Sequence, residues 1–466
     1  MKHLCIIFLC ILLSGCKEKS HQSDGSAGNN ESAPKFQVPV EYYKLDNGLK
    51  VILSPDDTSP TVIVAVYYNI GFRIEPKNRT GFAHLFEHMM FQGSKNLGKM
   101  EFINLVQKNG GVLNGSTRFD FTNYFEIVPA HKLETMLWAE ADRMKGLSIT
   151  QENLTNQQEV VKNEVKVNVL NQPYGGFPWL DMPQYANTNW FNAHNFYGDL
   201  DDLDAANLED VASFFKTYYA PNNAAISVVG DFDTKETKQW IEKYFGGIPS
   251  SELPAKPDIS EPKQTDEKRF VKDDKLANNP AMAFAYHMPE RNTPEYYAMG
   301  LLDQILIQGD NGLLRQKLVT EKGITSNING GINYLGNMFN YNGPMQLMFD
   351  FTYDNDKSTE EVISTVDEVM DSLKDNLTQE IIDNALIKVK SQLYDNFGGT
   401  FSLGRADLLC SFALFDDNPN RINDIESQFE SITPDIIKKT IDEFLRKTNR
   451  TILTVNPLLA NTQNTL

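Results

Sequence analysis

The stretch "TGFAHLFEHMMFQGSKN", which begins at Thr80, decides how the first half of the sequence is interpreted. It places His84 and His88 around Glu87 in otherwise apolar sequence. On a helix with its N-cap at Thr80 and its stop at Gly93, the two histidines occupy positions i and i+4 of one face. Two imidazoles on one face can bind one metal ion. Glu87 can then take a proton from water at that metal, as in other H-x-x-E-H sites.

A catalytic zinc site has three protein ligands and leaves a fourth position open for water. The third ligand must therefore come from elsewhere, and we look for it in "TNQQEVVKNEVKVNVLNQP", residues 155–173. This segment is expected to be a helix that ends at Pro173, and it offers Glu159 and Glu164. Spacing alone does not choose between the two glutamates.

The alternative interpretation of the motif is a pair of core histidines that satisfy each other's hydrogen bonds. Burying two imidazoles and a carboxylate without a metal or another partner is costly, because each polar group loses its hydration. We therefore favour a metal site.

The length and charge of the chain limit its class. With 466 residues the chain is too long for one ordinary domain, and it predicts two. Its formal net charge of −19 argues against a nucleic-acid binder, because a phosphate backbone requires a basic surface.

The first residues predict a targeting segment. A basic residue precedes an apolar run that is too short to span a bilayer, and "LSGC" resembles a bacterial lipobox. Residues 1–16 are therefore predicted to be a lipoprotein signal peptide whose removal leaves Cys16 lipid-modified. The alternative is an ordinary signal peptide that contains a cysteine. Residues 17–36 are polar and are expected to form a flexible tether. Only Cys410 then remains, which excludes an intramolecular disulfide and a cysteine-ligated metal.

The rest of the chain divides into two halves of similar order. Residues 37–250 open with a strand, an Asn-Gly turn and a second strand, and then alternate strands with helices. Residues 251–275 are rich in Pro, Lys and Asp and are expected to link the halves. Residues 276–466 again place a strand before a helix and a further strand. This repetition predicts a duplicated domain.

Four segments resemble, in order, the pitrilysin and mitochondrial processing peptidase family of zinc peptidases. They are "GFAHLFEHMMFQGSKN", "NGGVLNGSTRFDFTNYFEIVP", "EVVKNEV" and "YYAPNNAAISVVGDFD", and they cover most of the first half. The resemblance implies an α+β fold of two homologous α/β domains. Each would be a mainly antiparallel sheet packed with helices, and the pair would form half of a clamshell. It also implies one zinc ion per chain.

The resemblance selects the third ligand. It implies that His84, His88 and Glu164 bind zinc and that Glu87 is the catalytic base, whereas Glu159 falls outside the motif. The family often has a further glutamate seven residues before the third ligand, which supports the metal site without touching the ion. This chain has Gln157 at that position, a departure that is expected to weaken the orientation of the ligand.

The segment "LNGSTRFDFTNYFEI" alternates and is rich in aromatic residues, which predicts a strand. In the family the matching strand is an open edge beside the zinc, onto which an extended peptide adds through backbone hydrogen bonds. The alternative is that the asparagine only ends a turn. The substrate-binding residues implied here are Asn114, Gly115, Ser116 and Thr117.

The second half lacks two groups that the family usually supplies, an arginine and a tyrosine that reach the substrate carbonyl. In the matching block "LVTEKGITSN" the arginine position is Val319 or Thr320, and the tyrosine position is Ser326. Loss of these donors should reduce stabilisation of the oxyanion. The candidates to replace them are Arg315, Tyr334 and Tyr341.

The sequence therefore predicts a zinc metalloendopeptidase subunit that hydrolyses peptides or unfolded segments in a closed chamber. A homologous partner chain would supply the missing arginine and tyrosine. The alternatives are a self-sufficient homodimeric peptidase and a non-catalytic peptide-binding or scaffold subunit. The N-terminus predicts a lipid-anchored protein of the bacterial cell envelope, at the periplasmic face of the outer membrane, with its lipid as the sole membrane contact.

Overall fold

The computed structural model describes residues 37–398 and 403–458. The predicted signal peptide, Cys16 and the tether lie outside the described residues. No helix within the described ranges is long and apolar enough to cross a membrane. Cys410, in the second described range, is a buried free thiol.

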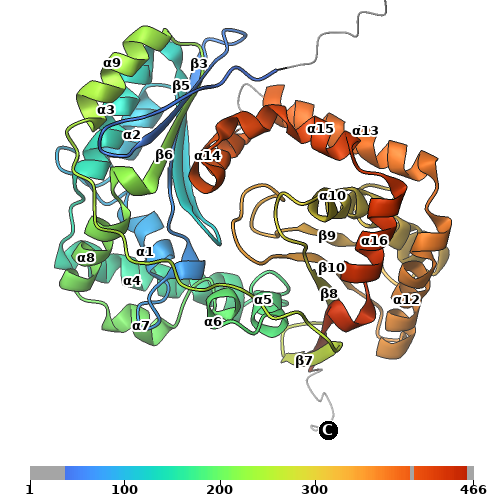
Figure 1. Ribbon diagram of the computed structural model, residues 1–466. Helices are drawn as coiled ribbons and strands as arrows, with labels where there is room; N and C mark the ends of the chain where they lie inside the picture. The colour runs from blue at the N-terminus through green and yellow to red at the C-terminus, as the bar shows by residue number, and fades with distance from the viewer. Residues whose placement is uncertain (1–36, 399–402, 459–466) are drawn as a thin grey trace, which may run out of the picture. The chain divides into compact units, whose positions relative to one another are not determined.

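The first half is built on a six-stranded sheet with the order β1-β2-β6-β3-β5-β4 (Figure 1). The β2–β6 pair is parallel and the other pairs are antiparallel. The turn between the first two strands needs glycine, because Gly48 has a φ of +88°. The strands are β1 (Glu41–Lys44), β2 (Lys50–Pro55), β3 (Thr61–Tyr68), β4 (Val112–Thr117), β5 (Thr122–Pro129) and β6 (Ala224–Gly230).

Both faces of this sheet are buried, so the central strand β3 is apolar throughout rather than alternating with polar residues. Alternate side chains of β3 enter two different cores. One core contains α3 and α9, and the other contains α14 from the second half, which packs on β2, β3 and β6 (Figure 1). The helices of the first half are α1 (Phe82–Met89), α2 (Glu101–Lys108), α3 (Leu133–Lys145), α4 (Gln151–Val165), α5 (Asp181–Ala186), α6 (Trp190–Ala193), α7 (Leu200–Ala205), α8 (Leu208–Tyr218) and α9 (Thr234–Phe245).

The second half has a five-stranded sheet with the order β7-β11-β8-β10-β9. Its strands are β7 (Lys268–Asp274), β8 (Ala281–His287), β9 (Asn329–Ile332), β10 (Gln346–Thr352) and β11 (Arg450–Pro457). Its helices are α10 (Pro294–Leu306), α11 (Leu313–Arg315), α12 (Thr359–Asn376), α13 (Gln379–Gly398), α14 (Gly404–Asp416), α15 (Ile425–Glu430) and α16 (Pro434–Phe444).

The two halves repeat one order of elements, which confirms the predicted fold class. In the first half β3 leads to α1, the β4–β5 pair, the helices α3 and α4, and finally β6. In the second half β8 leads to α10, the β9–β10 pair, the helices α12 and α13, and finally β11. Each sheet is mainly antiparallel and is packed with helices.

Two local predictions differ from the structure. The strand expected over "LNGSTRFDFTNYFEI" is a hairpin, because residues 118–121 turn the chain and let β4 pair with β5. The predicted linker, residues 251–275, also ends earlier than expected. Its last residues form β7, which pairs in parallel with β11. That pairing joins distant segments of the chain, so composition could not reveal it.

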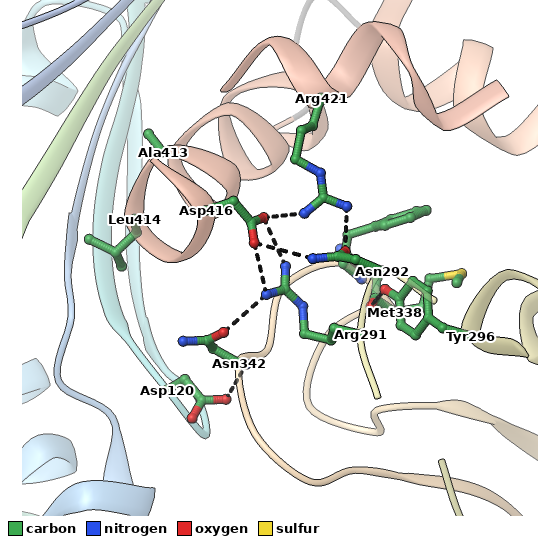
Figure 2. Close-up of polar contacts among 12 residues, drawn as sticks. Asp120, Arg291, Asn292, Tyr296, Met338, Asn342, Ala413, Leu414, Asp416 and Arg421 are labelled. Atoms are coloured by element: carbon green, nitrogen blue, oxygen red, sulfur yellow. Dashed lines mark hydrogen bonds and ion pairs between the residues drawn. The ribbon is translucent and has the colours of Figure 1, made fainter. Parts of the chain in front are cut away.

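Residues from Val38 onward form one unit, and polar contacts tie its two halves together. Asp416, at the end of α14, accepts hydrogen bonds from Arg291, which also donates to the side chain of Asn342 at 3.0 Å (Figure 2). The backbone N–H of Asn342 donates to Asp120 at 2.7 Å, in the turn of the β4–β5 hairpin. Asp120 also forms a buried ion pair with Arg73 at 2.8 Å. The turn of the hairpin is therefore fixed between both halves.

We predict that Asp120→Ala destabilises the protein by about 3 kcal/mol, because it leaves the charge of the buried Arg73 uncompensated. The urea midpoint of unfolding, followed by tryptophan fluorescence, measures the loss. Asp442→Ala is the matched control, because it removes an exposed ion pair with Lys374 and should leave the midpoint nearly unchanged. Equal effects of the two variants would contradict this account of the hairpin turn.

Candidate metal centre

The helix that carries both histidines begins one residue later than predicted. Its N-cap is Gly81, which has a φ of +79°, and not Thr80. Only glycine fits, because a Cβ there would lie 2.4 Å from the carbonyl oxygen of Tyr197. The Thr80 hydroxyl instead donates to Asp202 at 2.6 Å. The prediction missed this start because it depends on a segment more than 100 residues away.

A buried carboxylate holds the first turn of α1. Glu75 is fully buried and accepts hydrogen bonds from the backbone N–H groups of Gly81 at 2.9 Å and Ala83 at 2.5 Å. These N–H groups have no partner within the helix, so a carboxylate stabilises them by hydrogen bonding and by the helix dipole. His194 lies 3.8 Å away on the other side of this carboxylate.

Three side chains from α1 and α4 converge as the sequence predicts. Nε2 of His84 and Nε2 of His88 each lie 3.3 Å from Oε2 of Glu164. One ligand atom from each residue lies within 4.8 Å of the other two. Glu159 does not take part, because it is exposed and pairs with Lys162. The structure therefore brings Glu164, and not Glu159, to the histidines.

The three residues fit a zinc ion. Two imidazole nitrogens and one carboxylate oxygen form a donor set of the kind that catalytic zinc sites use. His84 is almost fully buried and its Nδ1 faces Oε2 of Glu87 at 3.5 Å, whereas the side chains of His88 and Glu164 are 21% and 27% exposed. The cluster is therefore closed on the side of His84 and open to solvent on the other, as a site with a free position requires.

Charge compensation holds this cluster together. Burial lowers the pKa of His84, but hydrogen bonds to Glu164 and Glu87 outweigh it and raise the pKa to about 9. Burial raises the pKa of Glu164, but its hydrogen bonds to His84 and His88 hold that pKa well below its usual range. Contacts between the imidazoles and the two carboxylates therefore offset the cost of burying these groups.

Glu87 lies beside the cluster of histidines and Glu164. Its Oε2 lies 3.5 Å from Nδ1 of His84 and accepts a hydrogen bond from the hydroxyl of Thr117 at 2.8 Å. Burial raises the pKa of Glu87, but the contacts with His84 and Thr117 lower it below its usual value. The carboxylate therefore stays ionised and can accept a proton.

The predicted substrate strand is β4, which lies at the edge of the first sheet. Asn114 is exposed and lies within the strand rather than at a turn, with its side-chain oxygen accepting from the N–H of Gly115. The Ser116 hydroxyl donates to Asn123 on β5. Thr117 differs from the other three, because it is buried and its hydroxyl points to Glu87.

The candidates to replace the missing arginine and tyrosine all contact groups of the second half. Arg315 donates to Asn327 at 2.8 Å, and the Tyr334 hydroxyl donates to Asp350 at 2.6 Å. Tyr341 is buried, and its hydroxyl has no partner among the described residues. Among the described residues, no hydrogen bond or ion pair joins any of the three to the cluster of histidines and Glu164.

Sequence reasoning missed one residue that touches the cluster. The hydroxyl of Tyr197 donates to Oε1 of Glu164 at 3.1 Å. The tyrosine lies in "AHNFYGD", which has no recognisable metal-binding pattern, and only the tertiary structure brings it to α4. Gln157, the position of the family's supporting glutamate, is buried and donates to its neighbour Asn156.

In the metal-free protein we predict that the imidazole of His84 titrates near pH 9 and carries a proton at pH 7.5. Glu164→Gln should lower this midpoint by about one unit or more, because a carboxylate partner is lost while burial remains. NMR of selectively labelled histidine measures the midpoint. Glu159→Gln on the same helix is the control and should leave it unchanged. A midpoint below 6.5 in the wild-type protein would contradict the described contacts.

Two parts of the chain match known groups of peptidase domains. Residues 50–191 match the family described as Insulinase (Peptidase family M16). Residues 205–389 match the family described as Peptidase M16 inactive domain. The two histidines and Glu164 all lie in the first of these ranges.

Named relatives agree with this match. The zinc protease PqqE of Helicobacter pylori is 26% identical over 442 residues, which cover 92% of this chain and 96% of the relative. The mitochondrial-processing peptidase subunit beta of Bos taurus is 25% identical over 235 residues, which cover 50% of this chain and 47% of the relative.

Solved structures share the fold. The crystal structure of a protease from Helicobacter pylori has a TM-score of 0.83 at 25% identity and covers 90% of this chain and 100% of its own. The first half of the periplasmic protease PqqL from Escherichia coli has a TM-score of 0.71 at 17% identity. The match to the full PqqL chain covers 47% of that chain. Together with the helix that carries the two histidines and the two repeated sheets, these matches show that the chain belongs to peptidase family M16.

Proposed function

We propose that this chain is a zinc metalloendopeptidase subunit with His84, His88 and Glu164 as the metal ligands. The observation that carries the proposal is their convergence within 4.8 Å beside an ionised Glu87. A bound zinc ion would supply a Lewis acid that polarises the scissile carbonyl and acidifies water. The relative named zinc protease supports the same chemistry.

Glu87 is the base in this proposal. Its carboxylate accepts a proton from the attacking water and donates that proton to the leaving amine. Thr117 keeps one carboxylate oxygen in place through a hydrogen bond of 2.8 Å, so the base is oriented before substrate arrives. Thr117 thus orients the base in this proposal, whereas the resemblance implies that it contacts the substrate.

An extended peptide is the substrate class that fits the edge strand. The outer edge of β4 has no partner strand among the described residues, so its backbone groups can pair with a peptide of almost any sequence. In this proposal Asn114, Gly115 and Ser116 contribute that edge. We propose peptides or unfolded segments as substrates because of this backbone pairing, and not because of a specificity pocket.

We propose that a homologous partner chain completes the site. Val319, Thr320 and Ser326 stand where the family has its arginine and tyrosine, so this chain lacks the usual oxyanion donors. The chain shares its fold with PqqL, and the matched region covers about half of the PqqL chain. A second chain of the same fold would make up the difference. A homodimer with substitute donors and a non-catalytic peptide-binding subunit are the alternatives.

We also propose a location in the bacterial cell envelope, with Cys16 lipid-modified. The support is the lipobox-like "LSGC" at the N-terminus. The structural neighbour PqqL is a periplasmic protease, which agrees with this location.

We predict that Glu87→Gln keeps zinc but loses at least about 10²-fold in peptide hydrolysis, because it removes the base without removing a ligand. Elemental analysis and cleavage of quenched fluorescent peptides, in the presence of the partner if one is required, measure the two properties. Glu159→Gln is the control and should keep both. If Glu87→Gln hydrolyses peptides as fast as the wild type, the proposed mechanism is wrong.

We predict that the chain alone binds zinc but hydrolyses peptides slowly. Adding a homologous chain that carries the arginine and tyrosine should raise the rate about 10²-fold or more, because oxyanion donors contribute that much. Initial rates with and without the added chain measure the effect. Fast, Glu87-dependent hydrolysis by the chain alone would instead support the homodimer.

A further inference from the structure

The two oxygens of the Glu164 carboxylate have different partners. Oε2 faces both histidines at 3.3 Å, whereas Oε1 accepts the hydroxyl of Tyr197 at 3.1 Å. A carboxylate that is free to rotate could present either oxygen, or both, to a metal. The hydrogen bond from Tyr197 occupies one oxygen and leaves the other for the ion.

The backbone of Tyr197 is fixed against the start of α1. A Cβ on Gly81 would lie 2.4 Å from the carbonyl oxygen of Tyr197, and a Cβ on Gly198 would lie 2.3 Å from the N–H nitrogen of Gly81. Both glycines have positive φ, +79° and +71°. The N–H of Tyr197 also donates to the side chain of Asn195 at 2.8 Å. The tyrosine therefore moves together with the helix that carries the histidines.

The ring of Tyr197 also contacts a ligand directly. It meets the imidazole of His84 edge to face, with ring centres 5.2 Å apart and planes at 88°. Phe196 packs against both rings, Trp179 packs against the ring of Tyr197, and Tyr197 itself is 4% exposed. Tyr197 thus contacts His84 on α1 and Glu164 on α4, and it joins the two elements that supply the ligands.

Gln157 does not provide this support. It is buried on α4, but its side-chain amide donates to the adjacent Asn156 at 2.7 Å, and among the described residues no hydrogen bond joins it to Glu164. An amide at this position also lacks the negative charge of the glutamate that the resemblance leads one to expect. The orientation of Glu164 must therefore come from another residue.

We propose that Tyr197 is a positioning residue that orients Glu164 for zinc and takes over the support that Gln157 does not give. The inference rests on the proposed function, because it requires that the cluster bind zinc. Hydrogen-bonding partners of metal ligands typically contribute about 10- to 100-fold in metal affinity. Tyr197 should contribute within that range.

The test is the zinc affinity of the full chain carrying Tyr197→Phe, measured by competition with a chromogenic chelator. We expect the dissociation constant to rise about 10- to 100-fold, because the ring stays but the hydroxyl is lost. The matched control is Tyr174→Phe, which removes a hydroxyl that donates to the carbonyl of Asn279 at 2.7 Å. It should leave the affinity unchanged.

Two further readouts separate positioning from folding. The thermal midpoint of the metal-free variant should stay close to that of the wild type. The visible spectrum of the cobalt-loaded variant should change, because the geometry of the carboxylate ligand changes. Equal zinc affinity and equal cobalt spectra in the wild type and Tyr197→Phe would overturn the role of Tyr197. If the wild-type chain itself binds no zinc, the proposed function fails instead.

Discussion

The contact between the start of α1 and the segment of Tyr197 and Gly198 is the constraint on which the site depends. Two backbones approach so closely that neither Gly81 nor Gly198 can carry a Cβ. Glu75 is buried at the same turn and accepts hydrogen bonds from the N–H groups of the helix start. The contact fixes the start of α1 against the segment whose Tyr197 hydroxyl donates to Glu164 of α4. A short helix of eight residues could not hold that position by its own stability.

Electrostatics prepare the cluster for a cation before any ion is bound. Burial lowers the pKa of His84, but the carboxylates of Glu164 and Glu87 outweigh it and raise that pKa to about 9, so this partly buried place favours positive charge. A divalent cation can replace the imidazole proton, and the same carboxylates then compensate the ion. Glu87 lies outside the group of candidate ligands and accepts a hydrogen bond from Thr117. The base and the ligands therefore lie in the same electrostatic environment, but only the ligands would occupy the metal position.

The sequence predicts what depends on local spacing and misses what depends on distant segments. The i and i+4 histidines and their helix follow from periodicity, as do the apolar strands. Glu159 and Glu164 are about 140° apart on a helix, so only one can face α1, but periodicity cannot say which. The resemblance selected Glu164, and the geometry agrees. The N-cap at Gly81, the hydrogen bond of Tyr197 and the pairing of β7 with β11 each join segments far apart in the chain, so no local pattern records them.

The repeated halves differ in chemistry although they share their order of elements. The first half holds the basic nitrogens, the carboxylates and the open edge strand, whereas Arg315 and Tyr334 of the second half are already engaged by Asn327 and Asp350. Freeing Tyr334 would leave the buried Asp350 without that hydroxyl donor, whereas Asn327 is exposed, so water can replace Arg315 there. Tyr334 is therefore poorly placed to become an oxyanion donor. In the proposed two-chain enzyme, this chain would contribute the ligands and the base, and its partner would contribute the oxyanion donors.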